Sequence, residues 1–523
     1  MLFSSLIFLY AFLPGLLLLY FVFRNSIFRK YLLIIFSLVF YAWGEPIYIF
    51  LMLMVVTLNY LFGLLIDEIE KKEIRKWYLI LDVSLNLLIL VFFKYSGLIV
   101  STLNQISFIN IPEIKLKLPL GISFYIFQAM TYIVDVYRKD INCQRKYSSL
   151  LLYISFFPQL IAGPIVKYKD IEAELEERKF NVDDAFSGSF KFSIGLAKKV
   201  LLANSLGKAA SILLDIQNLS RVSIWVGMIF FMLQLYFDFS GYSDMAIGLG
   251  RIFGFHYKEN FNYPYISKGI TDFWRRWHIS LSSFFREYVY IPLGGKYHLQ
   301  IRNIFIVWAL TGLWHGASWN FCLWGLYFAV ILIIEKYFIS KSNEIRIKKQ
   351  ESEKNDCQTN EIETSRVMNQ ETNQMALEAI NSRRSRKKKV IENPIAKNIF
   401  YKDSILKNIF IHIYTILALI IGFVLFYFEN ISSIKLAYSK MFSFALESIT
   451  LIEMSIIREN IIILILAIIA CTPLVKNLAE KISNKMNKNL ITILTTVIII
   501  VFFALSTLSI IGDTYNPFLY FRF

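Results

Sequence analysis

Long apolar segments constrain the fold of this chain more than any other feature. Several of them approach or exceed the roughly 20 apolar residues that an α-helix needs to cross a bilayer. Hydrophobic residues make up 56% of the 523 residues and charged residues only 18%, so the apolar surplus exceeds what a soluble core can bury. We therefore predict an all-α, polytopic integral membrane protein.

Charged loops between the apolar segments predict the topology. A first span at 2–23, two passes within 31–66 and a span at 78–100 place the charged segment 67–76 in the cytoplasm by the positive-inside rule. The net charge of +16 is then explained by basic cytoplasmic loops. No recognised nucleic-acid-binding motif accompanies this charge, so we expect no nucleic-acid partner.

One polar segment interrupts the later part of the chain. Further spans are predicted near 119–138, 184–214, 222–252, 405–428, 458–475 and 490–511. Residues 341–398 are instead rich in Lys, Glu, Asn, Ser and Gln and hold a cluster of arginines and lysines. Such a segment cannot bury enough surface to order itself. We therefore divide the chain into a membrane core, 1–340 and 404–523, and a disordered basic cytoplasmic insertion, 341–403.

Two segments carry polar or helix-breaking residues at membrane depth. Residues 148–181 hold two prolines and a glycine, which predicts either a re-entrant or broken helix lining a cavity or a proline-kinked span. Within 222–252, Asp238 and Asp244 interrupt an apolar pattern. Because a buried carboxylate without a partner is costly, each should meet a cation, a hydroxyl or cavity water. Either carboxylate can serve structure alone.

Residues 267–295 show a different periodicity. Aromatic and aliphatic residues recur at helical spacing on one face, and polar residues fall on another. This pattern predicts an amphipathic helix at an interface or at the floor of a cavity. His278 lies close to the apolar face of that helix. It is therefore either a functional histidine on the cavity side or a buried, hydrogen-bonded one.

The apolar segment 308–328 contains a single histidine, His315, between Trp314 and Gly316. A neutral imidazole there can accept a proton from a hydroxyl at physiological pH. As one helix, the segment would place Trp308, Thr311, Gly312, His315, Trp319 and Cys322 on the same face. Gly312 and Gly316 would let another helix approach closely. The alternative is a histidine that only packs.

The sequence lacks several common catalytic motifs. It contains no Gly-rich phosphate loop, no HExxH and no GxSxG, and its four cysteines form no CxxC pair, so we expect no metal site and no disulfide framework. Two histidines among tryptophans, without an obvious protein nucleophile, suit direct transfer of an acyl group to an alcohol. A proton-coupled transporter would use the same residues.

Several motifs, taken in order, resemble those of a known family. They are LPLGISFYIFQAMTYIVDVYR, FFPQLIAGPIV, YFDFSGYSDMAIGLGRIFGF, the block around WRRWHISLS, LTGLWHGASWNFCLWG and the terminal NPFLYFRF. Together they resemble the membrane-bound O-acyltransferase family, in particular its bacterial alginate O-acetyltransferase branch. The resemblance covers about residues 1 to 335 and 404 to 523. The insertion at 341–398 departs from the family pattern.

The resemblance implies a helical bundle around a central funnel or tunnel in the bacterial plasma membrane. His315 would be the catalytic histidine and His278 the second histidine of the family. No tightly bound cofactor is implied. Acetyl-CoA would be the cytoplasmic donor substrate, a polysaccharide the acceptor, and an outer-face acetyltransferase or esterase-like protein the partner. A related branch transfers D-alanine from a carrier protein to teichoic acid, and that alternative stays open.

Overall fold

The computed structural model describes most of the chain. It covers residues 1–23, 25–106, 111–112, 116–178, 180–339, 341, 405–444, 449–512 and 515–517. Within these ranges the regular secondary structure is helical, without a β-strand, which confirms the all-α prediction. Apart from residue 341, the predicted insertion lies outside the described residues.

Six of the described helices are long and apolar enough to cross a membrane. They are α3 (Tyr48–Glu68), α4 (Lys72–Ile106), α11 (Arg221–Ile252), the helix Trp319–Ile339, α16 (Ile405–Tyr427) and α20 (Lys488–Gly512). A bent pair, α18 (Leu451–Ala470) and α19 (Leu474–Ser483), gives a seventh span if its two parts, which meet at 66°, count as one. The chain is therefore a multi-pass membrane protein, as predicted.

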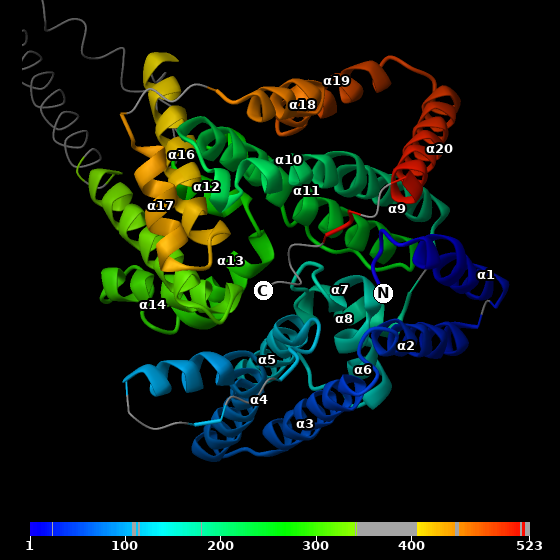
Figure 1. Cartoon of the computed structure of the whole chain (residues 1–523). Helices are drawn as coiled ribbons and strands as arrows, with labels where there is room; N and C mark the ends of the chain where they lie inside the picture. The colour runs from blue at the N-terminus through cyan, green and yellow to red at the C-terminus, as the bar shows by residue number, and fades with distance from the viewer. Residues whose placement is uncertain are drawn as a thin grey trace, which may run out of the picture.

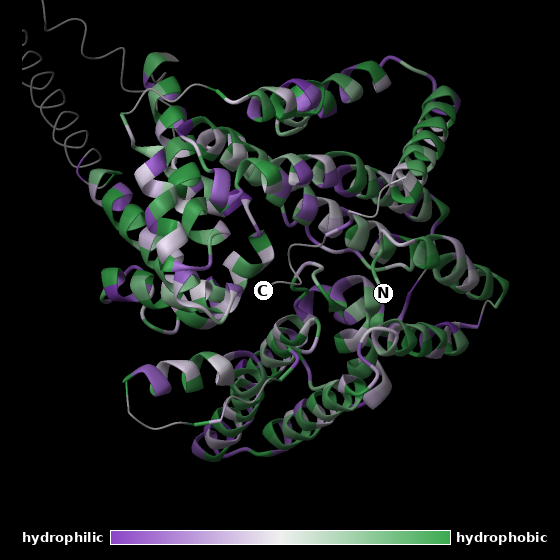
Figure 2. Cartoon of the chain, in the orientation of Figure 1, coloured by the Kyte–Doolittle hydropathy of each residue, from purple (hydrophilic) through white to green (hydrophobic). Residues whose placement is uncertain are grey.

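The helices form two groups around α11. The group at the bottom of Figure 1 contains α2 (Ser26–Ala42), α3, α4 and α5 (Ile122–Arg138). Helices α16 and α17 (Ile431–Met441) lie at the left of the view, and α18 to α20 lie along its top and upper right. Figure 2 shows that hydrophobic residues dominate the peripheral helices such as α20. The apolar stretch of α20 is only 6% buried and that of α11 is 78% buried, so α11 is a core helix and α20 an outer one.

Helix α11 packs closely against α9 (Val182–Ala197), which continues through η2 (Lys198–Ala203) into α10 (Asn204–Leu213). A side chain at Gly195 would meet the Gly241 carbonyl oxygen at 2.5 Å. The two carboxylates of α11 face basic residues of this neighbour. Lys199 pairs with Asp238 at 2.8 Å, and Lys198 and Lys191 pair with Asp244 at 2.7 and 3.2 Å. The prediction that both carboxylates meet a partner is confirmed.

The irregular segment after α5 is a broken helix. It divides into α6 (Tyr147–Ser155), α7 (Phe157–Leu160) and α8 (Tyr168–Glu176). Pro158 is the second residue of α7, within the first turn, where its missing N–H costs little. Ile161, just after α7, lines a small internal cavity. The broken-helix alternative is therefore confirmed over the kinked span.

The predicted amphipathic helix over 267–295 is wrong as a single element. The structure contains α12 (Ile270–Arg276), α13 (Ile279–Phe285) and the π-helix η5 (Arg286–Tyr290). His278 separates α12 from α13 with a left-handed φ of 44°. The break is fixed from elsewhere in the chain, because the backbone N–H of Ile279 donates to the carbonyl of Asn260 at 2.9 Å. Periodicity alone does not report such a contact.

The apolar segment 308–328 is likewise two helices. Helix α14 (Gln300–His315) ends at the histidine, and the chain turns back into Trp319–Ile339. A side chain at Gly312 would meet the Phe321 carbonyl oxygen at 2.4 Å, and one at Gly325 the Trp308 carbonyl oxygen at 2.3 Å. The predicted close helix approach at Gly312 is thus confirmed, within a hairpin. The predicted common face is wrong, because Trp319 and Cys322 belong to the second helix.

Candidate active site

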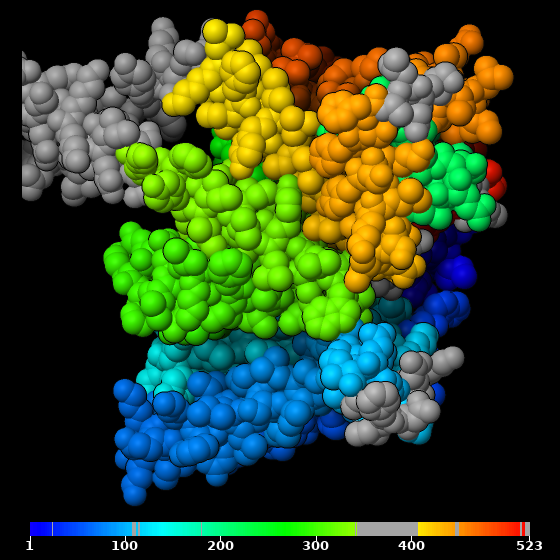
Figure 3. Space-filling view, turned by 60° about the vertical axis from the view of Figure 1, so that its left-hand side comes forward, coloured from blue at the N-terminus to red at the C-terminus, as the bar shows by residue number. Residues whose placement is uncertain are grey.

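The two candidate histidines line the same cavity. It has a volume of about 1060 Å³ and lies among α12, α13, η5, α14 and the helix Trp319–Ile339. His278 and His315 are 2% and 5% exposed, so both side chains face the protein interior. In the space-filling view the green part of the chain, which includes this cavity, lies between the blue N-terminal helices and the yellow and orange C-terminal helices (Figure 3).

His278 is held by hydrogen bonds at the break between α12 and α13. Its Nδ1 lies 3.2 Å from Oδ1 of Asn260, which also accepts from the backbone N–H and the hydroxyl of Ser280, at 3.1 and 2.9 Å. Because a backbone N–H can only donate, this Asn260 atom is an acceptor. Nδ1 of His278 must therefore donate, which leaves the lone pair of the neutral ring on Nε2.

His315 is held mainly by aromatic rings at the end of α14. Its ring centroid lies 4.8 Å from those of Trp314 and Trp324 and 5.2 Å from that of Phe426. All three rings present an edge or a tilted face to the imidazole, which is the preferred geometry of such contacts. Trp314 also lies 5.6 Å from the His278 ring. One tryptophan therefore contacts both histidines.

The outer part of the cavity is basic. The charged residues that line it are Arg275, Arg286, Lys296 and Lys336, and no carboxylate is among the described lining residues. Tyr297, which also lines the cavity, is 88% exposed, so the cavity reaches the surface there. A basic entrance with two buried imidazoles inside suits an anionic ligand whose reacting end is uncharged.

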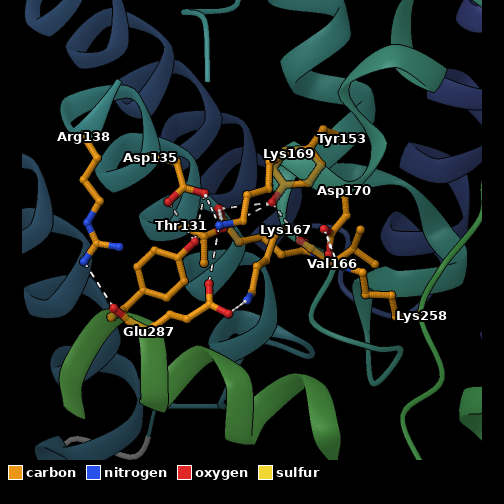
Figure 4. Close-up of polar contacts among 12 residues, drawn as sticks. Thr131, Asp135, Arg138, Tyr153, Val166, Lys167, Lys169, Asp170, Lys258 and Glu287 are labelled. Atoms are coloured by element: carbon orange, nitrogen blue, oxygen red, sulfur yellow. Dashed lines mark hydrogen bonds and ion pairs between the residues drawn. The ribbon is translucent and has the colours of Figure 1, made fainter. Parts of the chain in front are cut away.

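An ion-pair cluster attaches the η5 side of the cavity to α5 and α8 (Figure 4). Glu287 pairs with Lys167 at 2.6 Å and with Lys169 at 3.4 Å, and Lys169 lies 4.0 Å from Asp135. Arg138 donates to the backbone carbonyl of Glu287 at 3.2 Å. Burial raises the pKa of Glu287, but the hydrogen bond and charge of Lys167 outweigh it and hold that pKa below its usual value. The cluster fixes the position of η5.

The cavity entrance lies at the same end of the molecule as the charged loop between α3 and α4. Arg145, which follows α5, pairs with Asp67 and Glu68, the last two residues of α3, at 2.5 and 3.2 Å. Arg138, at the last turn of α5, reaches η5 beside the cavity. The positive-inside rule assigns this loop to the cytoplasm. The basic entrance therefore lies at the same end of the molecule as the loop that the sequence predicts to be cytoplasmic.

Sequence reasoning missed three residues around the histidines. Asn260 lies outside any periodic pattern, and its role follows only from the tertiary contact. Lys94 and Tyr95 of α4 donate to the backbone carbonyls of Trp314 and Leu313. The signal for Lys94 was present, because a charged residue inside an apolar span is a functional candidate by default. The same rule had been applied to the aspartates of α11.

Comparison with known proteins places this geometry in a family. The model of the membrane-bound O-acyltransferase family matches residues 133–359, which include both histidines. A probable alginate O-acetylase of Pseudomonas putida is 42% identical over 345 residues, and the match covers 64% of this chain and 71% of that protein. The chain belongs to the membrane-bound O-acyltransferase family. The resemblance inferred from the motifs is confirmed, and the chain is an O-acyltransferase.

Other relatives in this membrane-bound O-acyltransferase family differ in the acceptor that their names state. A probable alginate O-acetylase of Pseudomonas aeruginosa is 43% identical, over 64% of this chain and 66% of that protein. A peptidoglycan O-acetyltransferase of Helicobacter pylori is 36% identical, over 65% of this chain and 71% of that protein. A teichoic acid D-alanyltransferase of Bacillus subtilis is 31% identical, over 42% of this chain and 59% of that protein. The two acetyl-transferring relatives match more of the chain than the D-alanyl-transferring one.

Proposed function

We propose that this chain moves an acetyl group from cytoplasmic acetyl-CoA across the bacterial plasma membrane for O-acetylation of an extracytoplasmic polysaccharide. The observation that carries the proposal is the cavity with a basic entrance and with His278 and His315 in its lining. The higher identity to acetylases of alginate and peptidoglycan supports acetyl transfer over D-alanyl transfer.

His315 acts as the general base in this proposal. Its imidazole removes the proton of the acceptor hydroxyl as the hydroxyl oxygen attacks the acetyl carbonyl. The bond from carbonyl carbon to sulfur breaks, and the thiolate of CoA leaves and takes up a proton. A base at this place supplies about 10² to 10⁴ in rate. His278, whose tautomer Asn260 fixes, is the orienting residue.

The basic entrance supports a phosphorylated donor. Arginine and lysine are the usual protein ligands of phosphate groups, and CoA carries several phosphates at the end opposite its thioester. If Arg286 and Lys296 hold the phosphates at the entrance, the thioester end of the donor extends inward to the histidines. A D-alanyl carrier protein would present a similar phosphorylated arm, and it is the main alternative donor.

A partner protein completes the transfer in this proposal. Trp314 also lines a second, smaller cavity, on its side away from the entrance. The volume of this second cavity is only about 50 Å³, which is close to the space of one or two water molecules. A polysaccharide does not fit there. We therefore propose that an extracytoplasmic acetyltransferase or esterase-like protein carries the acetyl group from this chain to the polysaccharide.

Labelled donors in proteoliposomes test the proposal. The purified chain, together with an outer-face partner protein that supplies the acceptor hydroxyl, is given acetyl-labelled acetyl-CoA or a D-alanyl carrier protein on the entrance side. Free CoA thiol and labelled acceptor are then measured. We expect thiol release from acetyl-CoA only. Release from the carrier protein alone would favour D-alanyl transfer, and an intact thioester with translocated label would favour a transporter.

Variants of the entrance give a second readout. Arg286→Gln with Lys296→Gln should raise KM for acetyl-CoA by about tenfold or more at nearly unchanged kcat, since binding of phosphates is the same in ground and transition states. Lys258→Gln is the matched control. Lys258 pairs with Asp170 at 2.5 Å, is 76% exposed and does not line the cavity. Equal KM values in both variants would count against donor binding at the entrance.

A further inference from the structure

A lysine of the N-terminal half contacts the end of α14. Lys94 belongs to α4, is 8% exposed, and donates from Nζ to the backbone carbonyl of Trp314. The next residue, Tyr95, donates from its hydroxyl to the carbonyl of Leu313 at 2.7 Å. Two adjacent residues of α4 therefore bind the two residues that immediately precede His315.

These bonds are made where a helix end needs them. The last carbonyls of a helix have no N–H partner within it and carry the negative end of its dipole. Helix α14 ends at His315, and the next residue, Gly316, is extended. A cation at this carbonyl fixes the last turn of α14, and with it the base of the His315 side chain.

Packing alone does not explain a charge at this place. A buried ammonium is expensive, and an apolar residue of similar volume would fill the same space at lower cost. Lys94 has three N–H donors and one acceptor among the described residues. It also lines the cavity of about 50 Å³ together with Trp314 and the start of α5. The ammonium therefore lies at the meeting point of helix end and cavity.

Lys94 lies toward the acceptor side of the histidines. It follows Lys72, the first residue of α4, by 22 residues, which corresponds to about 33 Å of helix. The Lys72 end follows directly after the end of α3 at Asp67 and Glu68, and those residues lie at the end of the molecule where the large cavity opens. Lys94 therefore acts from the opposite side of Trp314 and His315.

We propose that Lys94 is a positioning residue of the acyl transfer, which holds the end of α14 from α4 and so fixes His315 between the donor cavity and the acceptor side. The inference rests on the proposed function. It assigns a role in turnover to α4, although none of the described residues of α4 lines the donor cavity. The expected signature is therefore a change in kcat without a change in donor binding.

Three variants of the full chain in proteoliposomes test the role. Lys94→Met removes the charge and the bond, Lys94→Arg keeps both, and Tyr95→Phe removes the neighbouring neutral bond as a matched control. We expect Lys94→Met to lower kcat by about tenfold or more with KM for acetyl-CoA within about twofold. Lys94→Arg should recover most of the turnover, and Tyr95→Phe should lose about threefold or less.

Several outcomes would overturn the role of Lys94. They are wild-type kcat per folded Lys94→Met molecule, an equal loss in Tyr95→Phe, or no recovery in Lys94→Arg. If Lys94→Met does not fold, Lys94→Gln, which keeps an N–H₂ donor group but no charge, takes its place in the same comparison. Failure of the proposed function is distinguishable, because the wild-type chain itself would then release no CoA from acetyl-CoA.

Discussion

The two turns that carry the histidines are built in opposite ways. His278 separates two short helices in a left-handed conformation, and hydrogen bonds that converge on Asn260 hold its ring. His315 ends a long helix with ordinary backbone geometry, and three aromatic rings surround its side chain. In the first turn polar bonds fix the tautomer. In the second, ring contacts and the bonds of α4 fix the position.

This difference suggests a division of labour between the two residues. A ring whose Nδ1 is committed to Asn260 presents the same atom, Nε2, at all times, which suits the orientation of a substrate. The aromatic contacts that hold the His315 ring do not depend on which ring nitrogen carries a proton, which suits a residue that gains and loses one. The comparison therefore predicts unequal losses when each histidine is replaced.

Replacement of His315 should have the largest effect. His315→Asn lacks a basic nitrogen, so we expect turnover to fall by about 10² to 10⁴, or roughly 3 to 5 kcal/mol of barrier. Donor affinity should stay close to wild type, because the phosphates bind at the entrance. The measurements are acyl transfer by the purified variant, its melting temperature and its affinity for acetyl-CoA.

Wild-type turnover in a folded His315→Asn protein would contradict the role of base, and a transporter would then explain the cavity better. His315→Gln serves as a second variant of larger volume. If both variants lose donor binding along with turnover, the ring shapes the donor cavity and the two histidine turns do not differ as proposed.

Replacement of His278 should lower turnover less than replacement of His315 does. The effect should also depend on whether the new residue tolerates the left-handed backbone conformation. Asparagine tolerates a left-handed conformation better than alanine, so His278→Asn should keep the break between α12 and α13. We expect about a tenfold loss of turnover in His278→Asn, near the value of one lost hydrogen bond. His278→Ala should show the same loss together with about 1 kcal/mol lower stability, which thermal unfolding measures.

A glycine variant of His278 separates the effect of the imidazole ring from that of the backbone conformation. His278→Gly removes the ring and relieves the conformational cost, so its stability should exceed that of His278→Ala. A variant that aggregates yet retains near-normal activity per folded molecule would assign His278 to packing alone.

Much of the architecture follows from the sequence, because composition and period dominate it. The multi-pass character, the buried histidines and the partners of Asp238 and Asp244 all derive from the cost of exposing apolar surface or burying charge. The individual spans follow less closely, because the predicted spans 2–23 and 119–138 are not among the six long apolar helices, and the spanning helix Trp319–Ile339 was not predicted. The two helix breaks do not follow from these costs. Periodicity continues through both turns, and only the contact with Asn260, distant in sequence, stops the helix before His278. Lys94 was identifiable as a charge in an apolar span, but its contact with Trp314 was not.

Removal of the Glu287 ion pairs should have a smaller effect than either histidine. Glu287→Gln leaves Lys167, which is 7% exposed, without its anion, and we expect a loss of about 1 kcal/mol because the carboxylate is partly exposed. Since folding lowers the pKa of Glu287 from 4.5, its contribution is full above that pH and disappears as the pH falls through the lowered pKa. The difference in thermal stability between Glu287→Gln and wild type should therefore shrink in acid.

The exposed ion pair of Arg145 with Asp67 provides the control for Glu287. Arg145 is 58% exposed, so Arg145→Gln should leave stability almost unchanged. An equal loss in both variants would mean that burial of Lys167 adds nothing to the Glu287 pair. Loss of turnover in Glu287→Gln without loss of stability would instead assign the cluster to the donor entrance.

Deletion of residues 345 to 392 should have the smallest effect. The composition of this segment predicts no packed core, and its placement lies outside the described residues. The deletion shortens the connection between the helix Trp319–Ile339 and α16, and α16 places the ring of Phe426 5.2 Å from the His315 ring.

If the shortened connection still lets α16 dock, turnover and membrane insertion should match wild type. If the shortened connection pulls α16 away, His315 loses its contact with Phe426 and kcat should fall. The hydrogen bond between His278 and Asn260 should persist, because neither His278 nor Asn260 contacts Phe426. Measurement of kcat, donor KM and melting temperature for the deletion beside His315→Asn therefore tests whether the aromatic contacts of His315 or the insertion itself controls activity. Loss of all activity with α16 in place would contradict the prediction.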